Sequence, residues 1–184
     1  TIEEAEGAEA MTAAVAEVRE LVRSTLQDVR ELAVELRPKA LDDFGLVAAL
    51  ERLTSSFEEQ TGISLAFQST LGPDRLPPEV ETALYRICHE LLNNARKHAA
   101  PRHVEVNLKS EPAEIRMIVI DDGKGFDVNA YRAVRPETSF GLAGVTERNE
   151  LVGGTFGLGS EPGKGTRGEV RIPLDRANLS EGAA

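Results

Sequence analysis

The sequence is poor in cysteine, in clustered basic residues and in long apolar runs, and each shortage excludes a class of protein. Cys88 is the only cysteine among 184 residues, so no disulfide can form within the chain, which fits a reducing compartment. No apolar run approaches the roughly 18 residues that span a bilayer, and no signal peptide is recognisable. The net charge is −10 and no basic run occurs, which argues against nucleic acid as a direct partner. We therefore expect a cytoplasmic location.

Apolar or small residues recur at alternating steps of three and four over residues 8–37. They are Ala8, Met11, Val15, Val18, Val22, Thr25, Val29, Leu32 and Leu36. This heptad pattern predicts a long helix packed against other helices in a dimer or bundle, and the alternative is one amphipathic helix that covers its own domain. Pro38 ends the helix. Because the chain begins at Thr1 within this pattern and without methionine, we expect a segment of a longer protein.

The rest of the chain predicts an α+β domain, a two-layer sandwich with helices on one face of a mixed sheet. Helices are expected from Asp42 or Asp43 to Gly62, at about 78–99 and at about 141–152, and strands at 63–69, 103–109, 114–120, 154–160 and 168–174. The polar residues 127–140 predict a mobile loop. The expected domains are 1–40, a packing helix; 41–175, the sandwich; and 176–184, a disordered tail.

The helix at 78–99 carries an apolar stripe on one face and three polar residues on the other. The stripe, which we expect to be buried, consists of Val80, Ala83, Leu84, Ile87, Cys88, Leu91, Leu92 and Ala95. On the opposite face, Asn94 offers a neutral oxygen suited to Mg²⁺, and Glu90 can orient or deprotonate a reacting group. Lys97 and the neighbouring His98 can reach phosphate oxygens. Taken alone, this helix is better explained by an ordinary solvated face that carries common polar residues.

Three further segments suggest a nucleotide pocket. In DDGKGF (121–126), an apolar strand ends in Asp121, whose carboxylate can accept a hydrogen bond from an exocyclic amine, and Gly123 and Gly125 allow tight backbone turns. The alternative for this segment is a plain hairpin turn. GLAGVTER (141–148) opens a helix whose free amides favour an anion, although its glycines also suit close helix packing. GSEPGKGT (159–166) is either a simple turn or a segment that brings the hydroxyl of Thr166 back to the pocket.

The ordered set HELLNNARKHA (89–99), DDGKGF, GLAGVTER and GSEPGKGT resembles the four motifs of the Bergerat-fold ATPases. This superfamily includes DNA gyrase B, the ninety-kilodalton heat-shock chaperone, MutL and the sensor histidine kinases. The Lys-His ending of the first motif is most similar to the histidine kinases. The segment LRPKALDDFGLVAALERL (36–53) resembles the subclass whose dimerisation helix ends in LRP…LD..GL and whose response regulators usually carry a helix-turn-helix output.

The resemblance implies a role for each matching residue. Asn94 would hold Mg²⁺, and Glu90 would act as the general base or orienting group. Lys97, His98, Gly141, Leu142 and Gly144 would lie on the phosphate side of ATP. Asp121, Gly123, Gly125 and Thr166 would surround the adenine. Residues 127–140 would form the ATP lid, within which Arg132 and Arg135 either reach the phosphates or stay solvated.

The chain departs from the family pattern in one respect. Kinases of this subclass carry a phosphoaccepting histidine on the first dimerisation helix, but His89, His98 and His103 all lie beyond residue 60. The resemblance therefore implies that residues 1–40 are the second dimerisation helix, without the acceptor, and that the chain is the C-terminal part of a kinase. Its expected partners are ATP with Mg²⁺, its own phosphotransfer domain, a response regulator and a second copy. The alternatives are a serine kinase of the anti-sigma type and a docking module that binds nucleotide without turnover.

Overall fold

The computed structural model describes residues 39–72, 75–134 and 140–174, and the chain divides into two units after Pro38. Every described helix and strand belongs to the second unit, Lys39–Ala184. The predicted heptad helix, Arg135 and the predicted tail lie outside the described residues. None of the helices in the described ranges combines the length and apolar character needed to cross a membrane.

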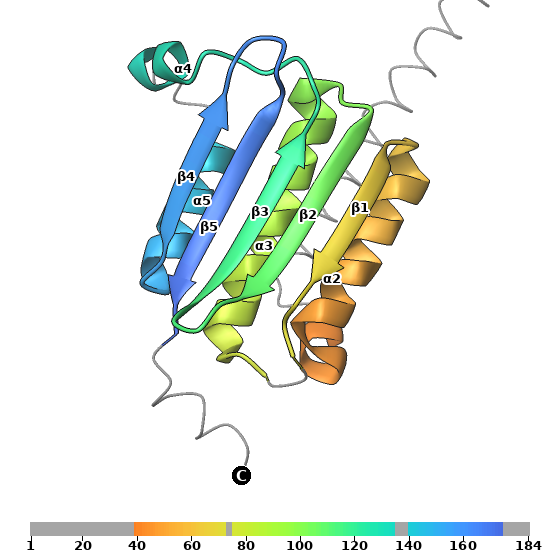
Figure 1. Ribbon diagram of the computed structural model, residues 1–184, viewed down its shortest axis with the longest axis vertical. Helices are drawn as coiled ribbons and strands as arrows, with labels where there is room; N and C mark the ends of the chain where they lie inside the picture. Colours follow the sequence, from red (N-terminus) through yellow and green to blue (C-terminus); the bar gives the residue numbers. More distant parts are fainter. Residues whose placement is uncertain (1–38, 73–74, 135–139, 175–184) are drawn as a thin grey trace, which may run out of the picture. The chain divides into compact units, whose positions relative to one another are not determined.

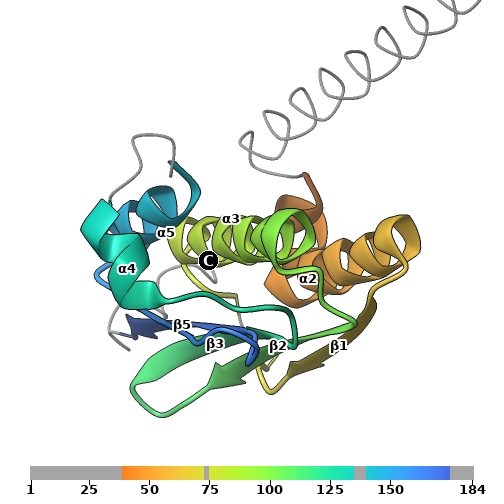
Figure 2. The same ribbon diagram turned by 90° about the horizontal axis from the view of Figure 1, so that it is seen from above.

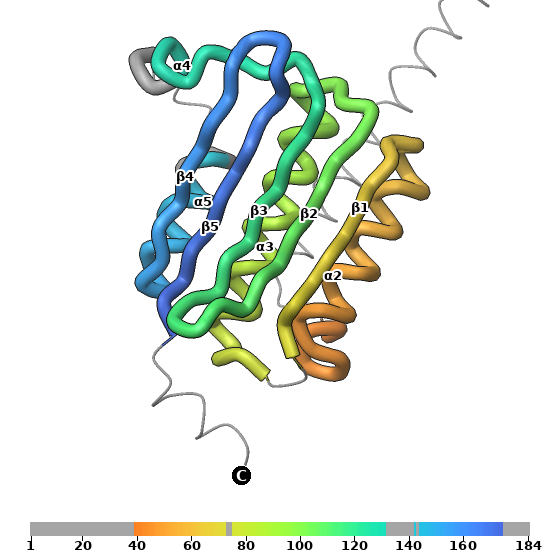
Figure 3. The backbone as a smooth tube through the Cα atoms, in the orientation of Figure 1, coloured from red at the N-terminus to blue at the C-terminus, as the bar shows by residue number. Residues whose placement is uncertain are grey.

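Five strands form one mixed sheet in the order β1-β2-β3-β5-β4 (Figure 1). β1 (Ser64–Ser69) runs parallel to β2 (His103–Ser110), and the connection between them contains helix α3 (Pro78–Asn94), as the backbone trace shows (Figure 3). The other pairs are antiparallel: β2 with β3 (Glu114–Asp121), β3 with β5 (Thr166–Pro173), and β5 with β4 (Thr155–Ser160). The edge strands within the described part of the chain are therefore β1 and β4.

Three helices cover one face of this sheet (Figure 2). They are α2 (Lys39–Thr61), α3, and α5 (Phe140–Leu151). The structure confirms the predicted α+β two-layer arrangement. The opposite face of the sheet carries none of the helices α2, α3 and α5.

The core forms because α3 and the strands each have one apolar face. All eight residues of the predicted α3 stripe are buried. Alternate residues of the central strands meet them, since period-2 alternation sends every second side chain to the same face. These are Val104, Val106, Leu108, Ile115, Met117, Val119, Val170 and Ile172.

The structure differs from the predicted elements at three places. α2 begins at Lys39, before the predicted capping residues, and its helical geometry is interrupted at Gly45 (φ 81°, ψ 177°). The predicted loop 127–140 contains a helix, α4 (Val128–Val134), so the loop prediction is wrong for this part. The carboxylate of Asp127 explains the helix, because it accepts hydrogen bonds from the amides of Asn129 (2.8 Å) and Ala130 (3.0 Å) and so caps the first turn. Finally, the end of the predicted helix at 78–99 is the π-helix η1 (Ala95–Ala99).

Candidate nucleotide site

Three of the four motif segments meet at one end of the sheet, where η1, the turn after β3 and the β4–β5 hairpin lie together (Figure 1). The amide of Lys124 donates a hydrogen bond to the carbonyl of Ala99 (2.9 Å), which joins the turn to the end of η1. The carbonyl of Lys124 accepts a bond from the amide of Gly163 (2.6 Å), which joins the turn to the hairpin. These two bonds bring together segments that lie far apart in the sequence.

Asp121 lies at the centre of this arrangement, with only 7% of its surface exposed. Its Oδ1 accepts a hydrogen bond from the amide of Gly123 (2.9 Å), and Thr166, its partner across the β3–β5 register, also hydrogen bonds to it. Burial raises the pKa of Asp121, although the bonds from Gly123 and Thr166 act in the opposite direction. A carboxylate fixed in this way is an acceptor of defined direction at the end of a strand.

The glycines of the turn are required by contacts within the chain. A Cβ at Gly123 would lie 2.5 Å from the carbonyl oxygen of Ala99 and 2.8 Å from Oδ1 of Asp121. Gly125 has a positive φ of 57°, and a Cβ there would overlap the carbonyl oxygen of Glu161. Backbone freedom and the approach of a flat base were the reasons expected for these glycines; close packing of the turn against η1 and the hairpin is an additional one.

Glu90 and Asn94 face each other one turn apart on α3, and both are half-buried. The Asn94 amide nitrogen donates to Oε1 of Glu90 (3.1 Å). With the nitrogen engaged, the amide oxygen is the atom that Asn94 offers to a hard cation. In the part of the chain that the structure describes, no three His, Cys, Asp or Glu side chains gather closely enough to hold a metal ion by themselves.

The remaining predicted residues occupy less enclosed positions. Lys97 and His98 are exposed on η1, a wide helical turn of the kind often found at functional sites. Gly141, Leu142 and Gly144 lie in the first turns of α5. A Cβ at Gly144 would approach the Arg148 guanidinium to 3.0 Å, so this glycine also serves packing within its helix.

The other two histidines, His89 and His103, each contact a neighbouring polar side chain. His89 is half-buried on α3, and its ring lies 3.3 Å from the amide nitrogen of Asn93. His103 begins β2, as expected, and its Nδ1 lies 3.3 Å from the hydroxyl of Ser64. His103 also pairs with Glu105 at 3.7 Å.

Two residues that hold the site together were not identified from the sequence. The hydroxyl of Ser160 accepts a bond from the amide of Phe126 (2.9 Å) and donates to the carbonyl of Gly165 (2.7 Å), so it fixes the hairpin to the turn. Oδ1 of Asp122 accepts bonds from the amides of Arg102 (2.7 Å) and His103 (2.9 Å), and these bonds lower the pKa of Asp122. Ser160 lies within GSEPGKGT and Asp122 is the second acid of DDG, but neither motif indicates these partners.

Comparison with known proteins places this geometry in a family. Residues 79–176 match the family described as histidine kinase-, DNA gyrase B- and HSP90-like ATPase. The chain belongs to this ATPase family. The match begins at α3 and extends past β5, so it includes Glu90, Asn94, Asp121 and Thr166.

Histidine kinases are among the proteins that this chain resembles. The signal transduction histidine-protein kinase/phosphatase DegS of Brevibacillus brevis is 37% identical over 160 residues, which are 87% of this chain and 40% of that protein. This chain thus spans less than half the length of that relative. The histidine kinase domain of the Erythrobacter litoralis EL346 blue-light activated kinase superposes with a TM-score of 0.56 at 24% identity, over 71% of this chain and 62% of that one.

A second solved structure has the same fold. The mycobacterial sensor histidine kinase MprB aligns over 68% of this chain and 91% of its own, with a TM-score of 0.52 and 20% identity. Together with the family match and the DegS likeness, the resemblance to the ATP-binding domain of sensor histidine kinases is confirmed.

Proposed function

We propose that this chain binds ATP with Mg²⁺ and supplies the γ-phosphoryl group to a histidine, for relay to an aspartate of a response regulator. The observation that carries the proposal is the junction of three motifs through Lys124, which puts the Asp121 turn against the end of the helix that bears Glu90 and Asn94. Membership in the ATPase family and the likeness to DegS support the kinase class.

The donor set fits a magnesium nucleotide. Mg²⁺ prefers six oxygen ligands and usually keeps several waters beside substrate phosphates, so one protein oxygen is a sufficient contribution. The amide oxygen of Asn94 would be that ligand, because the amide nitrogen is held by Glu90. When bound, Mg²⁺ neutralises the charge that builds up on the β- and γ-phosphates.

Each remaining residue has a role that its position supports. Asp121 would accept a hydrogen bond from the adenine amino group, with Gly123, Gly125 and Thr166 shaping that side of the pocket. Lys97 and His98 would contact phosphate oxygens, as would the start of α5 at Gly141, Leu142 and Gly144. Glu90 would accept a hydrogen bond from the N–H of the acceptor imidazole and so direct the opposite ring nitrogen at the γ-phosphorus.

In the transfer step, a bond forms between the imidazole nitrogen and phosphorus while the bond from phosphorus to the ADP oxygen breaks. Positioning and charge neutralisation provide most of the rate, because the transition state needs little covalent help from the protein. Residues 1–40 would be the second helix of the dimerisation domain, residues 41–175 the catalytic domain and 176–184 a tail. The acceptor histidine would belong to the same kinase, in a homodimer of the LRP…LD..GL subclass.

Calorimetric titration with ATP in the presence and absence of Mg²⁺ tests the proposal. We expect Asn94→Ala to weaken the Mg²⁺-dependent part of ATP binding by at least about 10- to 100-fold, the loss found when only an outer partner of a metal ligand is removed. Asn93→Ala is the matched control, because Asn93 is the adjacent half-buried amide and contacts His89 instead of Glu90. Equal binding by the two variants would refute the assignment of Asn94.

Two further measurements test the recognition of adenine and the class of kinase. Asp121→Asn should weaken ATP binding and reduce its preference over GTP, because an amide presents a donor where the carboxylate presents only acceptors. With labelled ATP and a histidine-bearing polypeptide of the same kinase, the product should be acid-labile phosphohistidine. An acid-stable phosphate would instead identify a serine kinase.

A further inference from the structure

The helix-free face of the sheet has a hollow of about 430 Å³ at the edge strand β4. We call it the β4 hollow. Its lining includes Thr155, Gly157 and Gly159 from β4 with Arg167, Glu169 and Arg171 from β5. Gly159 is the first residue of the motif GSEPGKGT, but the proposed nucleotide site gives no role to it or to the other lining residues.

Nothing in the described part of the chain requires glycine at positions 157 and 159 of the β4 hollow. Neither Gly157 nor Gly159 has a positive φ, so their backbone conformation suits any residue. A Cβ at Gly159 would meet nothing within 4 Å, and one at Gly157 would meet only the carbonyl oxygen of Glu169, at 3.9 Å. Glycine weakens a strand interior and often marks the close approach of another backbone or ligand.

The edge of β4 is also unprotected. Edge strands commonly avoid pairing with other chains by means of charged residues, proline or bulges. The sequence of β4, TFGLGS, contains no charged residue and no proline, and its register with β5 is uninterrupted from Thr155 to Ser160. In the described part of the chain β4 pairs with no strand other than β5, and α4 lies beside the end of β4 that leads into the hairpin (Figure 1). An added strand would pair with the part of the β4 edge that α4 leaves uncovered.

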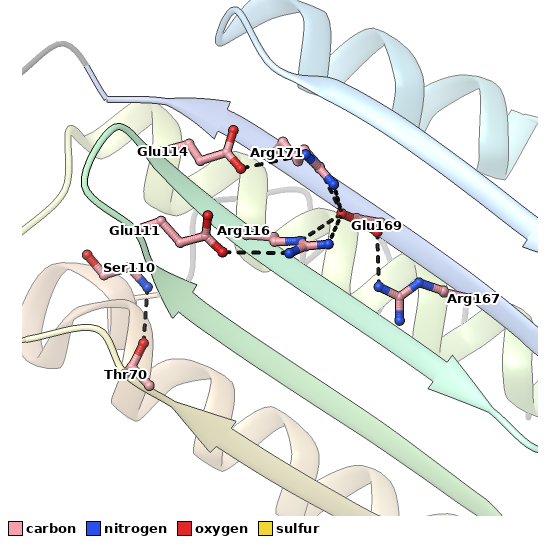
Figure 4. Close-up of polar contacts among 8 residues, drawn as sticks. All are labelled: Thr70, Ser110, Glu111, Glu114, Arg116, Arg167, Glu169 and Arg171. Carbon is pink, nitrogen blue, oxygen red and sulfur yellow. Dashed lines mark hydrogen bonds and ion pairs between the residues drawn. The ribbon is translucent and has the colours of Figure 1, made fainter.

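Three arginines and three glutamates form a network of ion pairs beside the hollow (Figure 4), in which Arg116 also pairs with Glu111 (3.6 Å) and Arg171 with Glu114 (3.9 Å). The lining itself holds Arg167, Arg171 and Glu169, so it has one positive charge in excess. The carboxylate of Glu169 is shared by Arg116 (2.7 Å), Arg171 (2.7 Å) and Arg167 (3.0 Å). Burial by itself raises the pKa of Glu169, but hydrogen bonds from the three guanidinium groups outweigh it and lower the pKa to about 2. Arg167 and Arg171 are 42% and 47% exposed, so each still presents donors to solvent beside the glycines.

We propose that the β4 hollow binds an extended, acidic segment of a partner protein, which adds to the sheet beside β4. A strand paired with β4 would lie about 10 Å from β5, two strand spacings away. A glutamate on that strand and an arginine on β5 together span this distance only if the strand between them carries no side chain. Gly159 provides that gap opposite Arg167, and Gly157 extends it beside Glu169, whereas Arg171 is paired with Thr155.

An acidic segment fits the hollow better than a second copy of this chain does. Two β4 edges paired with each other would bring glycines against glycines and leave both hollows unfilled. Charge-assisted bonds to guanidinium groups and main-chain pairing, in contrast, both favour an extended partner with alternating carboxylates.

Nuclear magnetic resonance of the ¹⁵N-labelled chain tests this proposal with a blocked peptide in which glutamate alternates with threonine. We expect amide shifts in β4 and β5, reversed by added salt, and none with the same peptide carrying lysine for glutamate. Gly159→Val should weaken binding by about tenfold or more while the spectrum stays folded, because the new side chain has space in the free chain but fills the gap. Gly72→Val is the control, since a Cβ at that exposed glycine also meets nothing within 4 Å.

Arg167→Gln should weaken binding independently of the glycine substitution. Absence of shifts in β4, equal shifts with the lysine peptide, or unchanged affinity of Gly159→Val would each overturn the proposal. Concentration-dependent dimerisation through β4, abolished by Gly159→Val, would overturn it in favour of a second copy. ATP binding should be the same in all these variants, so the test is independent of the proposed kinase function.

Discussion

Replacing Arg75 should destabilise the domain more than the loss of any ordinary surface arginine. Arg75 donates from Nε to Oε1 of Glu81 (2.8 Å) and from Nη2 to Oε2 (2.8 Å), and the Glu81 side chain is only 2% exposed. The same guanidinium donates to the carbonyls of Leu41 (2.6 Å) and Asp42 (3.3 Å). The substitution Arg75→Met therefore leaves a buried carboxylate without its counterion and removes the donor of two carbonyls at the start of α2.

The expected loss in free energy of unfolding is large because removing one partner of a buried ion pair costs more than replacing both partners with apolar residues. Removing one partner of a buried ion pair costs about 3–5 kcal/mol, and since Arg75 is 48% exposed, water can reach part of the site, so we expect about 2–4 kcal/mol. The double variant Arg75→Met with Glu81→Leu removes the unpaired charge as well. It should recover at least half of the lost stability, because apolar replacement of a buried pair is often close to neutral.

Urea denaturation followed by circular dichroism measures these differences. A loss of about 3 kcal/mol lowers the midpoint by about 1.5–2 M at a slope typical of a domain of this size. Arg102→Met is the control, since Arg102 has an exposed side chain. The reasoning would be refuted by a change below about 1 kcal/mol for Arg75→Met, or by a double variant as unstable as the sum of the single variants.

Three further outcomes follow from the described contacts. In Gly165→Ala, a Cβ would overlap the carbonyl oxygen of Asp121, so the melting temperature should fall well below that of Gly163→Ala, which has a similar φ but nothing within 4 Å; equal melting would contradict this. The pKa of Glu169 is lowered from 4.5 to about 2, so its stabilisation is complete above about pH 4.5 and is lost as pH falls towards 2. Glu169→Gln should remove this acid-dependent stabilisation, which is about 1–2 kcal/mol after solvent screening. If the variant and the parent chain showed the same dependence of stability on pH, the contribution of Glu169 would be excluded. Burial raises the pKa of Cys88 to about 12, so native protein at pH 8 should react with a disulfide reagent only as fast as it unfolds; rapid labelling would show an accessible thiol.

Sequence periodicity was sufficient to predict the layers of the fold. The α3 stripe repeats with the period of a helix, and all eight of its predicted residues are buried. The strands alternate with a period of two, and each predicted strand overlaps an observed one. Asp121 was also found from its place at the end of an apolar strand, because that position depends on local sequence alone.

The contacts that join distant segments, both in the site and outside it, depend on residues far apart in the sequence, and only the tertiary structure decides them. Ser160 bonds to Phe126 across 34 residues, and Arg75 reaches the carbonyl of Leu41 across 34 residues. No local pattern encodes such pairs, because they depend on strand register and on the path of the connections. The helix capped by Asp127 was missed for a smaller reason: its seven residues are too short to display a helical period. Periodicity thus reports which face of an element is buried, whereas register determines which side chains meet, and register exists only once the sheet has formed.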